Sequence, residues 1–117
     1  MNPGDIVLVA FPRVDLVHGK LRPALVIALM PGRHEDVLVA MISSKTHQLI
    51  AGFDELIAES DSDFAVTGLK KTSVIRLSRL ATVERNIIPA KLGEIHDARM
   101  AVIYERLISL LESQKTS

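Results

Sequence analysis

The sequence predicts a small, mainly β protein in which an antiparallel sheet curls into a barrel and one C-terminal helix packs on it. Three observations predict this fold class. Short apolar runs rich in β-branched residues recur along the chain, the alternation of the last long run slips partway as at a β-bulge, and a clear helical pattern follows. The length of 117 residues suits one modest core, so we expect a single domain over residues 1–117.

Three strands are expected in the first part of the chain. The run Asp5–Phe11 is apolar almost throughout, which is typical of a strand buried on both faces. The runs Arg22–Leu29 and Asp36–Ser43 have the same character. A polar loop over Pro12–Leu21 and a Pro-Gly turn within Met30–Glu35 separate the three runs.

The rest of the chain holds one ambiguous segment, one long strand and one helix. Phe53–Ser60 fits a short helix or a strand. Ser73–Glu84 alternates between apolar and polar residues until its phase slips near Arg79, which indicates a bulge. Asp97–Ser113 has apolar residues at helical spacing, with Asp97 as the expected N-cap. The apolar stripe of this helix is wide enough for one edge to meet a partner subunit.

Composition narrows the function classes. Fourteen basic and fourteen acidic residues cancel, so any attraction for nucleic acid must be local. No cysteine is present for disulfide or thiolate chemistry, and no apolar run is long enough to span a bilayer. The N-terminal run lacks the features of a signal peptide, so we expect a cytoplasmic protein that does not enter a membrane. The acidic residues near position 60 are interpreted as a solvated face.

Hairpin geometry brings two distant residues together. Folding the second and third strands about the Gly32–Arg33 bond places Leu29 opposite Asp36 and Arg22 opposite Ser43. Directly opposed residues of antiparallel strands point to the same side, with Cβ atoms about 5 Å apart. We therefore expect Arg22 and Ser43 to share one rim of the sheet.

Other cationic side chains converge on that rim. The first loop ends there and brings His18 and Lys20, while Lys45 and His47 leave from the same rim. Each residue alone is more often an ordinary surface residue, but the guanidinium, hydroxyl, ammonium and imidazole groups together suit an RNA phosphate. His34 lies at the opposite end of the hairpin and is excluded from the site.

Other catalytic signatures are missing from the sequence. It contains no phosphate-binding Walker loop, no GxSxG motif and no HExxH motif. The four histidines do not show the spacing of metal ligands. We expect neither a metal ion nor a cofactor.

Four segments carry a family resemblance in the same order along the chain. They are Gly4-Asp5-Ile6-Val7-Leu8-Val9 with Phe11-Pro12, Arg22-Pro23-Ala24-Leu25-Val26-Ile27, Gly68-Leu69-Lys70 through Ser73-Val74-Ile75-Arg76-Leu77 to Leu80-Ala81-Thr82, and Lys91-Leu92-Gly93-Glu94-Ile95 before the helix. This ordered set resembles the MazF/PemK family of toxins, and its PemK-like branch most closely.

The resemblance implies a Src-homology-3-like barrel shared with CcdB, a homodimer, and a cognate antitoxin whose acidic tail blocks the RNA groove. It implies the toxin of a type II toxin-antitoxin system, an mRNA interferase that cuts single-stranded RNA. It also implies that Arg22 and Ser43, the pair selected by the hairpin, carry catalysis. Ser43 stands where many members have threonine, and Arg79, a further expected RNA contact, where many have glutamine.

The resulting hypothesis is metal-independent cleavage in which the ribose 2′-OH attacks the adjacent phosphate and leaves a 2′,3′-cyclic phosphate. Arg22 and Ser43 stabilise the phosphate, and His18 is the candidate general acid or base. Lys20, Lys45 and His47 hold flanking phosphates. Two alternatives remain: a non-catalytic barrel that binds a protein target such as gyrase, as CcdB does, and an unrelated β-barrel adaptor.

Overall fold

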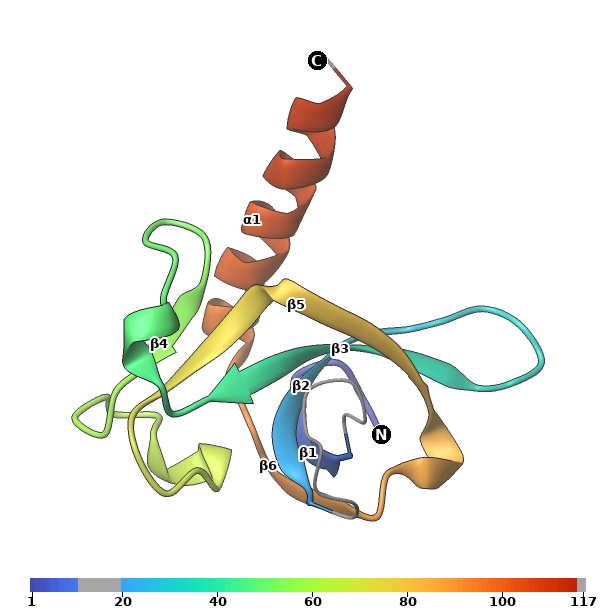
Figure 1. The fold of residues 1–117 in the computed structure, drawn as a ribbon, viewed down its shortest axis with the longest axis horizontal. Coiled ribbons are helices and arrows are strands. Elements are labelled where there is room, and N and C mark those ends of the chain that lie inside the picture. Colours follow the sequence, from blue (N-terminus) through green and yellow to red (C-terminus); the bar gives the residue numbers. More distant parts are fainter. Residues whose placement is uncertain (11–19, 116–117) are drawn as a thin grey trace.

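The computed structural model describes residues 1–10 and 20–115 and shows a curled antiparallel sheet with one long helix standing against it (Figure 1). The strands are β1 (Asp5–Val9), β2 (Arg22–Leu29), β3 (Asp36–Ser43), β4 (Glu55–Ile57), β5 (Ser73–Glu84) and β6 (Ala90–Glu94), and the helix is α1 (Asp97–Gln114). Short 3₁₀ turns occupy η1 (Thr46–Gln48), η2 (Ala65–Thr67) and η3 (Arg85–Ile87). The spatial order β4-β5-β3-β2-β1-β6 confirms the mainly β fold class with a C-terminal helix.

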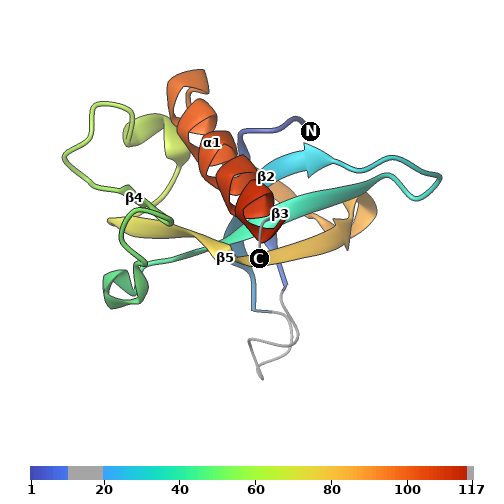
Figure 2. The ribbon, with the colours of Figure 1, turned by 90° about the horizontal axis from the view of Figure 1, so that it is seen from above.

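Both faces of the central strands are buried. In Figure 2, α1 is seen over β2 and β3. The isoleucine and leucine side chains of one face of the sheet pack against the first turns of α1, where Met100 and Ile103 are buried. The opposite, inner face is rich in valine and is lined by β1, β2 and β3. Alternate residues of one strand serve the two cores, as Ile6 and Val7 do. β1 is therefore buried on both faces, as predicted.

The β2–β3 hairpin has the predicted register in one half only. Ala24 lies opposite Met41, which is the expected pairing near the rim. A bulge partway along the hairpin then shifts the register by one residue, so that Leu29 lies opposite Val37. The prediction that Leu29 faces Asp36 is wrong for this reason. A regular ladder counted from the turn cannot include a bulge.

The β5 strand has the bulge that the slipping phase predicts. Met41 of β3 lies opposite Arg76, but the next β3 residue, Ala40, lies opposite Leu80. The residues Leu77–Arg79 are therefore left out of the ladder between β3 and β5. This interruption bends β5, which is one means by which a sheet curls.

Several boundaries differ from the sequence predictions. Within the ambiguous Phe53–Ser60 segment only Glu55–Ile57 forms a strand. The strand at Ala90–Glu94 was not predicted, because its residues are mostly exposed and show no apolar alternation. The N-cap of α1 is His96, and Asp97 is instead the first helical residue, where its carboxylate still favours the positive end of the helix dipole.

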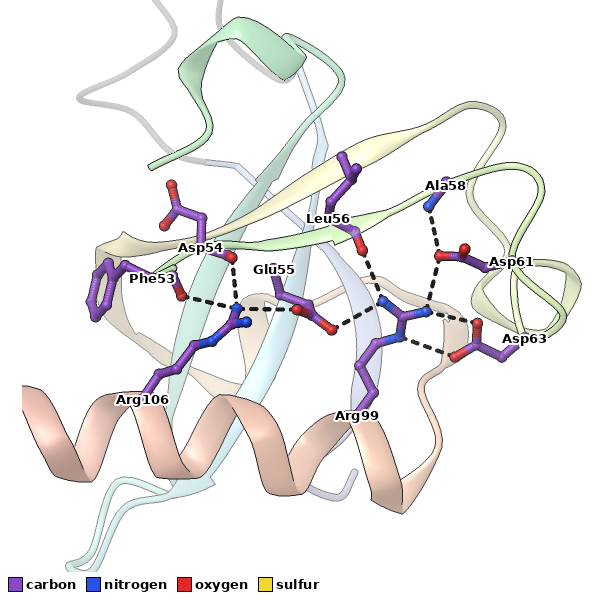
Figure 3. Close-up of polar contacts among 9 residues, drawn as sticks. All are labelled: Phe53, Asp54, Glu55, Leu56, Ala58, Asp61, Asp63, Arg99 and Arg106. Atoms are coloured by element: carbon purple, nitrogen blue, oxygen red, sulfur yellow. Dashed lines mark hydrogen bonds and ion pairs between the residues drawn. The ribbon is translucent and has the colours of Figure 1, made fainter. Parts of the chain in front are cut away.

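The acidic side chains near position 60 are not a solvated face, contrary to the sequence interpretation. All five N–H groups of Arg99 are used: they reach both carboxylate oxygens of Asp63, one of Asp61, one of Glu55, and the carbonyl oxygen of Leu56, at 2.8–3.1 Å (Figure 3). Hydrogen bonding from Arg99 is the main cause that lowers the pKa of Asp63. The same contact raises the pKa of Arg99.

Arg106 makes a second tie between α1 and the β4 segment. Its Nη1 donates to the carbonyl oxygens of Phe53 (3.3 Å) and Asp54 (2.7 Å) and to Glu55 Oε1 (3.1 Å) (Figure 3). Glu55 therefore bridges the two arginines of the helix. These contacts fix α1 against the strand that borders β5.

Removing Arg99 should destabilise the fold. In an Arg99→Met variant three carboxylates lose their common partner and repel one another, and we expect a loss of about 1–2 kcal/mol after allowance for partial solvent exposure. Urea denaturation at pH 7 measures this loss, with Arg33→Met on the exposed hairpin turn as the control.

The stabilisation by Arg99 should depend on pH. Because the pKa of Asp63 is lowered in the folded state, the contribution of its carboxylate to stability is present at neutral pH and lost on acidification. The gap between wild type and Arg99→Met should therefore shrink below about pH 4; a constant gap would contradict this account.

Candidate functional site

The structure places Arg22 and Ser43 at one rim and on one face of the sheet. β2 begins at Arg22 and β3 ends at Ser43. The register in which Ala24 lies opposite Met41, continued by two residues, sets Arg22 opposite Ser43. Both side chains therefore extend the valine-rich inner face to its rim, with Cβ atoms about 5 Å apart.

The hydroxyl group of Ser43 is held by the turn that follows β3. Its Oγ accepts the backbone N–H of Lys45 at 3.1 Å. No hydrogen bond among the described residues uses the hydroxyl hydrogen of Ser43, so this hydroxyl can donate to a ligand at the rim. The contact also substitutes in part for a β-branch, because it restricts the rotamer of an otherwise mobile serine.

A second arginine, Arg76 of β5, joins this face from the other side of β3. Met41 lies between Ala24 and Arg76, and Ser43 lies opposite Val74, so Arg76 occupies the row next to Ser43. Diagonal neighbours of this kind are about 7–8 Å apart at Cα, within reach of a long side chain. Strands two apart are separated by about 10 Å, so the backbones at Arg22 and Arg76 flank Ser43 at that spacing.

The guanidinium of Arg76 is half-buried and incompletely paired. Its Nε is buried and has no hydrogen-bond partner among the described residues. A buried donor without an acceptor costs about 1–3 kcal/mol, so this group suits an acceptor that the described residues do not supply. A phosphate oxygen is an acceptor of the required charge.

Arg76 is not among the site residues that the sequence predicts. The alternation of β5 placed Val74 and Arg76 on one side of that strand, which was the available signal. It did not show which strand β5 joins, because that pairing connects residues distant in sequence.

The other predicted site residues lie around the rim to differing degrees. Lys20, Lys45 and His47 are exposed and lie just before β2 or just after β3, so the structure brings them to the same rim. Arg79 is exposed on the β5 bulge, without a β3 residue opposite it, and so lies farther along the strand than Arg76. His18 lies outside the described residues.

The site-forming segments carry only positive formal charge. Residues 20–34 and 37–53 contain no aspartate or glutamate, and neither do residues 74–83. The zero net charge of the chain therefore conceals a local excess of positive charge at this rim, from Arg22, Arg76 and the lysines that flank β2 and β3. Within the described ranges no three His, Asp or Glu side chains gather in a way that could hold a metal ion.

Comparison with known families gives a match over nearly the whole chain. Residues 2–111 match the model of the PemK-like, MazF-like toxins of type II toxin-antitoxin systems. The chain belongs to this toxin family. Comparison with curated protein sequences gives no match. In the described part of this PemK-like toxin, no helix combines the length and apolar character needed to cross a membrane.

Solved structures share the fold of this PemK-like toxin. The Mycobacterium tuberculosis toxin MazF-mt6 superposes with a TM-score of 0.67 at 19% identity, over 92% of this chain and 96% of that one. An endoribonuclease from a mycobacterial species, solved in complex with its cognate antitoxin, gives a TM-score of 0.63 at 14% identity, over 96% and 95% of the two chains. At these identities the likeness shows the fold alone.

Replacing Arg76 should not harm the fold of the toxin. Arg76→Met keeps most of the side-chain volume and removes a buried donor without an acceptor, so we expect the free energy of unfolding to stay the same or rise by about 1 kcal/mol. Urea denaturation beside Arg99→Met provides the comparison, because that arginine is fully paired. A loss with Arg76→Met as large as the loss with Arg99→Met would show that Arg76 has a structural role.

Proposed function

We propose that this toxin is a metal-independent endoribonuclease, an mRNA interferase that cuts single-stranded RNA. One observation carries the proposal: Arg22, Ser43 and Arg76 lie on adjacent strands and on one face, at a rim whose described segments contain no aspartate or glutamate. The family supports it, and so does the likeness in fold to a protein described as an endoribonuclease. The family match does not favour the alternative of a CcdB-like protein that binds gyrase.

The proposed reaction is an in-line transfer within the RNA backbone. The ribose 2′-oxygen attacks the adjacent phosphorus while the bond from phosphorus to the 5′-oxygen breaks. The products are a 2′,3′-cyclic phosphate and a 5′-hydroxyl end. Two proton movements are needed: the attacking 2′-OH loses a proton, and the leaving 5′-oxygen gains one.

The residues of the rim have distinct roles in this reaction. Arg22 and Arg76 approach the phosphate from opposite sides and stabilise the negative charge that grows on its non-bridging oxygens. Neither serves as a base, since a guanidinium group stays charged in proteins and cannot accept a proton. Ser43 donates its hydroxyl hydrogen to a phosphate oxygen. His18 is the proposed general acid or base, because an imidazole group can donate and accept protons at neutral pH.

Flanking nucleotides are held by the exposed cations around the rim. Lys20 and Lys45 contact the neighbouring phosphates, and His47 and Arg79 extend the contact along the strand. Such contacts fix the position of the RNA more than they read its bases. The acidic tail of a cognate antitoxin would compete for the same cations, in the cytoplasm where the RNA substrate lies.

We also propose that the toxin is a homodimer, on the evidence of the exposed end of α1. The carboxyl half of α1 projects away from the sheet (Figure 1). Ile108 is 55% exposed and Leu111 66% exposed there, although they continue the apolar stripe that Met100 and Ile103 bury nearer the start of the helix. An apolar half-helix outside the core fits a second copy of the chain.

The first functional test uses a defined single-stranded RNA in EDTA. We expect cleavage that leaves 2′,3′-cyclic phosphate ends, and no cleavage of DNA or of RNA methylated at the 2′ oxygen, since the nucleophile is then missing. Arg22→Ala and Ser43→Ala should each slow cleavage by about 100-fold or more, whereas Arg33→Ala at the far end of the hairpin should not. Equal cutting of DNA would overturn the mechanism.

The dimer is tested by charge placed on the projecting helix. Leu111→Glu should turn a dimer into a monomer in sedimentation equilibrium, because an ionised carboxylate in an apolar interface is costly. Val66→Glu puts the same charge on η2, at another exposed apolar residue, and should leave the dimer intact. The homodimer proposal fails if wild type sediments as a monomer, or if both variants stay dimeric.

A further inference from the structure

Asp54 is a buried acid with no part in the proposed chemistry. It is 3% exposed and lies just before β4. Its Oδ1 accepts the backbone N–H of Leu77 at 2.9 Å, and its Oδ2 accepts that of Ile50 at 2.9 Å. Among the described residues this carboxylate therefore serves backbone amides, one of them in the β5 bulge. Burying a carboxylate is costly, so the buried position of Asp54 requires an explanation.

The amide of Leu77 lies where β5 leaves its regular pairing on both sides. The β3 ladder reaches Arg76 and resumes only at Leu80. The β4 ladder ends at the pair of Glu55 with Ile75. Asp54 thus supplies from a side chain the acceptor that a neighbouring strand would normally supply, and it holds the first residue of the bulge in place.

The position of this bulge decides where Arg76 points. Arg76 precedes Leu77 in the chain. Its side chain faces the rim only while Arg76 stays opposite Met41. A slip of one residue would send its side chain to the other face of the sheet. Leu77 is buried in the core under α1, so Asp54 and that core hold the same residue from two directions.

The backbone of Asp54 is in turn held in place by a residue of α1. Arg106 of α1 donates to the carbonyl oxygen of Asp54 at 2.7 Å (Figure 3), and the Asp54 N–H donates to the carbonyl oxygen of Ile50 at 2.9 Å. The backbone of Asp54 is therefore fixed on both sides of its side chain. A continuous set of contacts leads from α1 through Asp54 to Leu77 and the residue next to it.

We infer that Asp54 is a positioning residue for the RNA site: its hydrogen bond to the Leu77 amide fixes the β5 bulge and so aims Arg76 at the phosphate. This inference rests on the proposed ribonuclease function. Asp54 does not touch the substrate. It acts through Arg76 and leaves Arg22, which β2 positions independently, unaffected.

The test is a double-mutant cycle on single-turnover RNA cleavage. Asp54→Ala should lower the cleavage rate by about 10- to 100-fold, the size expected from misplacing one group of a site. It should lower the rate little further when Arg76 is already methionine, but should add its full effect to Arg22→Lys. Asp54→Asn, which keeps an oxygen acceptor for Leu77, should restore much of the rate.

A matched control separates positioning from general destabilisation. Asp61→Ala also removes a carboxylate that accepts a backbone N–H, that of Ala58 at 2.9 Å, but this carboxylate lies away from the bulge. It should lower stability without the selective dependence on Arg76. If Asp54→Ala slows cleavage equally in the wild-type and Arg76→Met backgrounds, the inference is wrong while the ribonuclease proposal stands.

Hydrogen exchange at the Leu77 amide gives a readout that needs no activity. This amide should be protected in the wild-type protein and in Asp54→Asn, which keeps the oxygen acceptor, and should exchange much faster in Asp54→Ala. Rapid exchange in wild type would overturn the anchor whatever the cleavage result. Absence of RNA cleavage by wild type would overturn the ribonuclease proposal, and the positioning role with it, even if the amide is protected.

Discussion

The antiparallel register of β2, β3 and β5 is the constraint on which the rest of the structure depends. It sets Arg22 opposite Ser43 and places Arg76 in the adjacent row. The register is strongly specified because both faces of these strands are buried. A slip of one residue would exchange the valine-rich face for the face under α1 and bring charged side chains into a core.

Local sequence patterns were sufficient to predict most of the strands and the helix. β1, β2, β3 and β5 are runs of apolar residues, and α1 repeats its apolar residues at helical spacing, so local patterns identify them. β6 was not predicted because its residues are largely exposed. It forms a strand because the edge of β1 supplies its hydrogen-bond partners. The N-cap was misplaced by one residue since no side chain caps α1.

The site residues also differ in whether a local sequence pattern or a contact between distant segments positions them. Arg22 and Ser43 belong to one hairpin. Counting from its turn paired them because the bulge between Val26 and Ala28 offsets by one residue the different pairing at the Leu29 end. Arg76 enters through the pairing of β3 with β5, which no local pattern specifies. The role of Asp54 could not be predicted from the sequence either. Its partner is the backbone N–H of Leu77, which lacks a strand partner only because β5 is irregular there.

The bulge in β5 also bears on when the molecule acquires its activity. Ser43 and Arg76 meet only through contacts that close a long loop of chain, and such contacts form late and slowly compared with a hairpin. Under the proposed function, a chain still emerging from the ribosome can form the β2–β3 hairpin but lacks its second guanidinium. The proposed RNA site is then incomplete until synthesis has passed β5 and β5 has paired with β3.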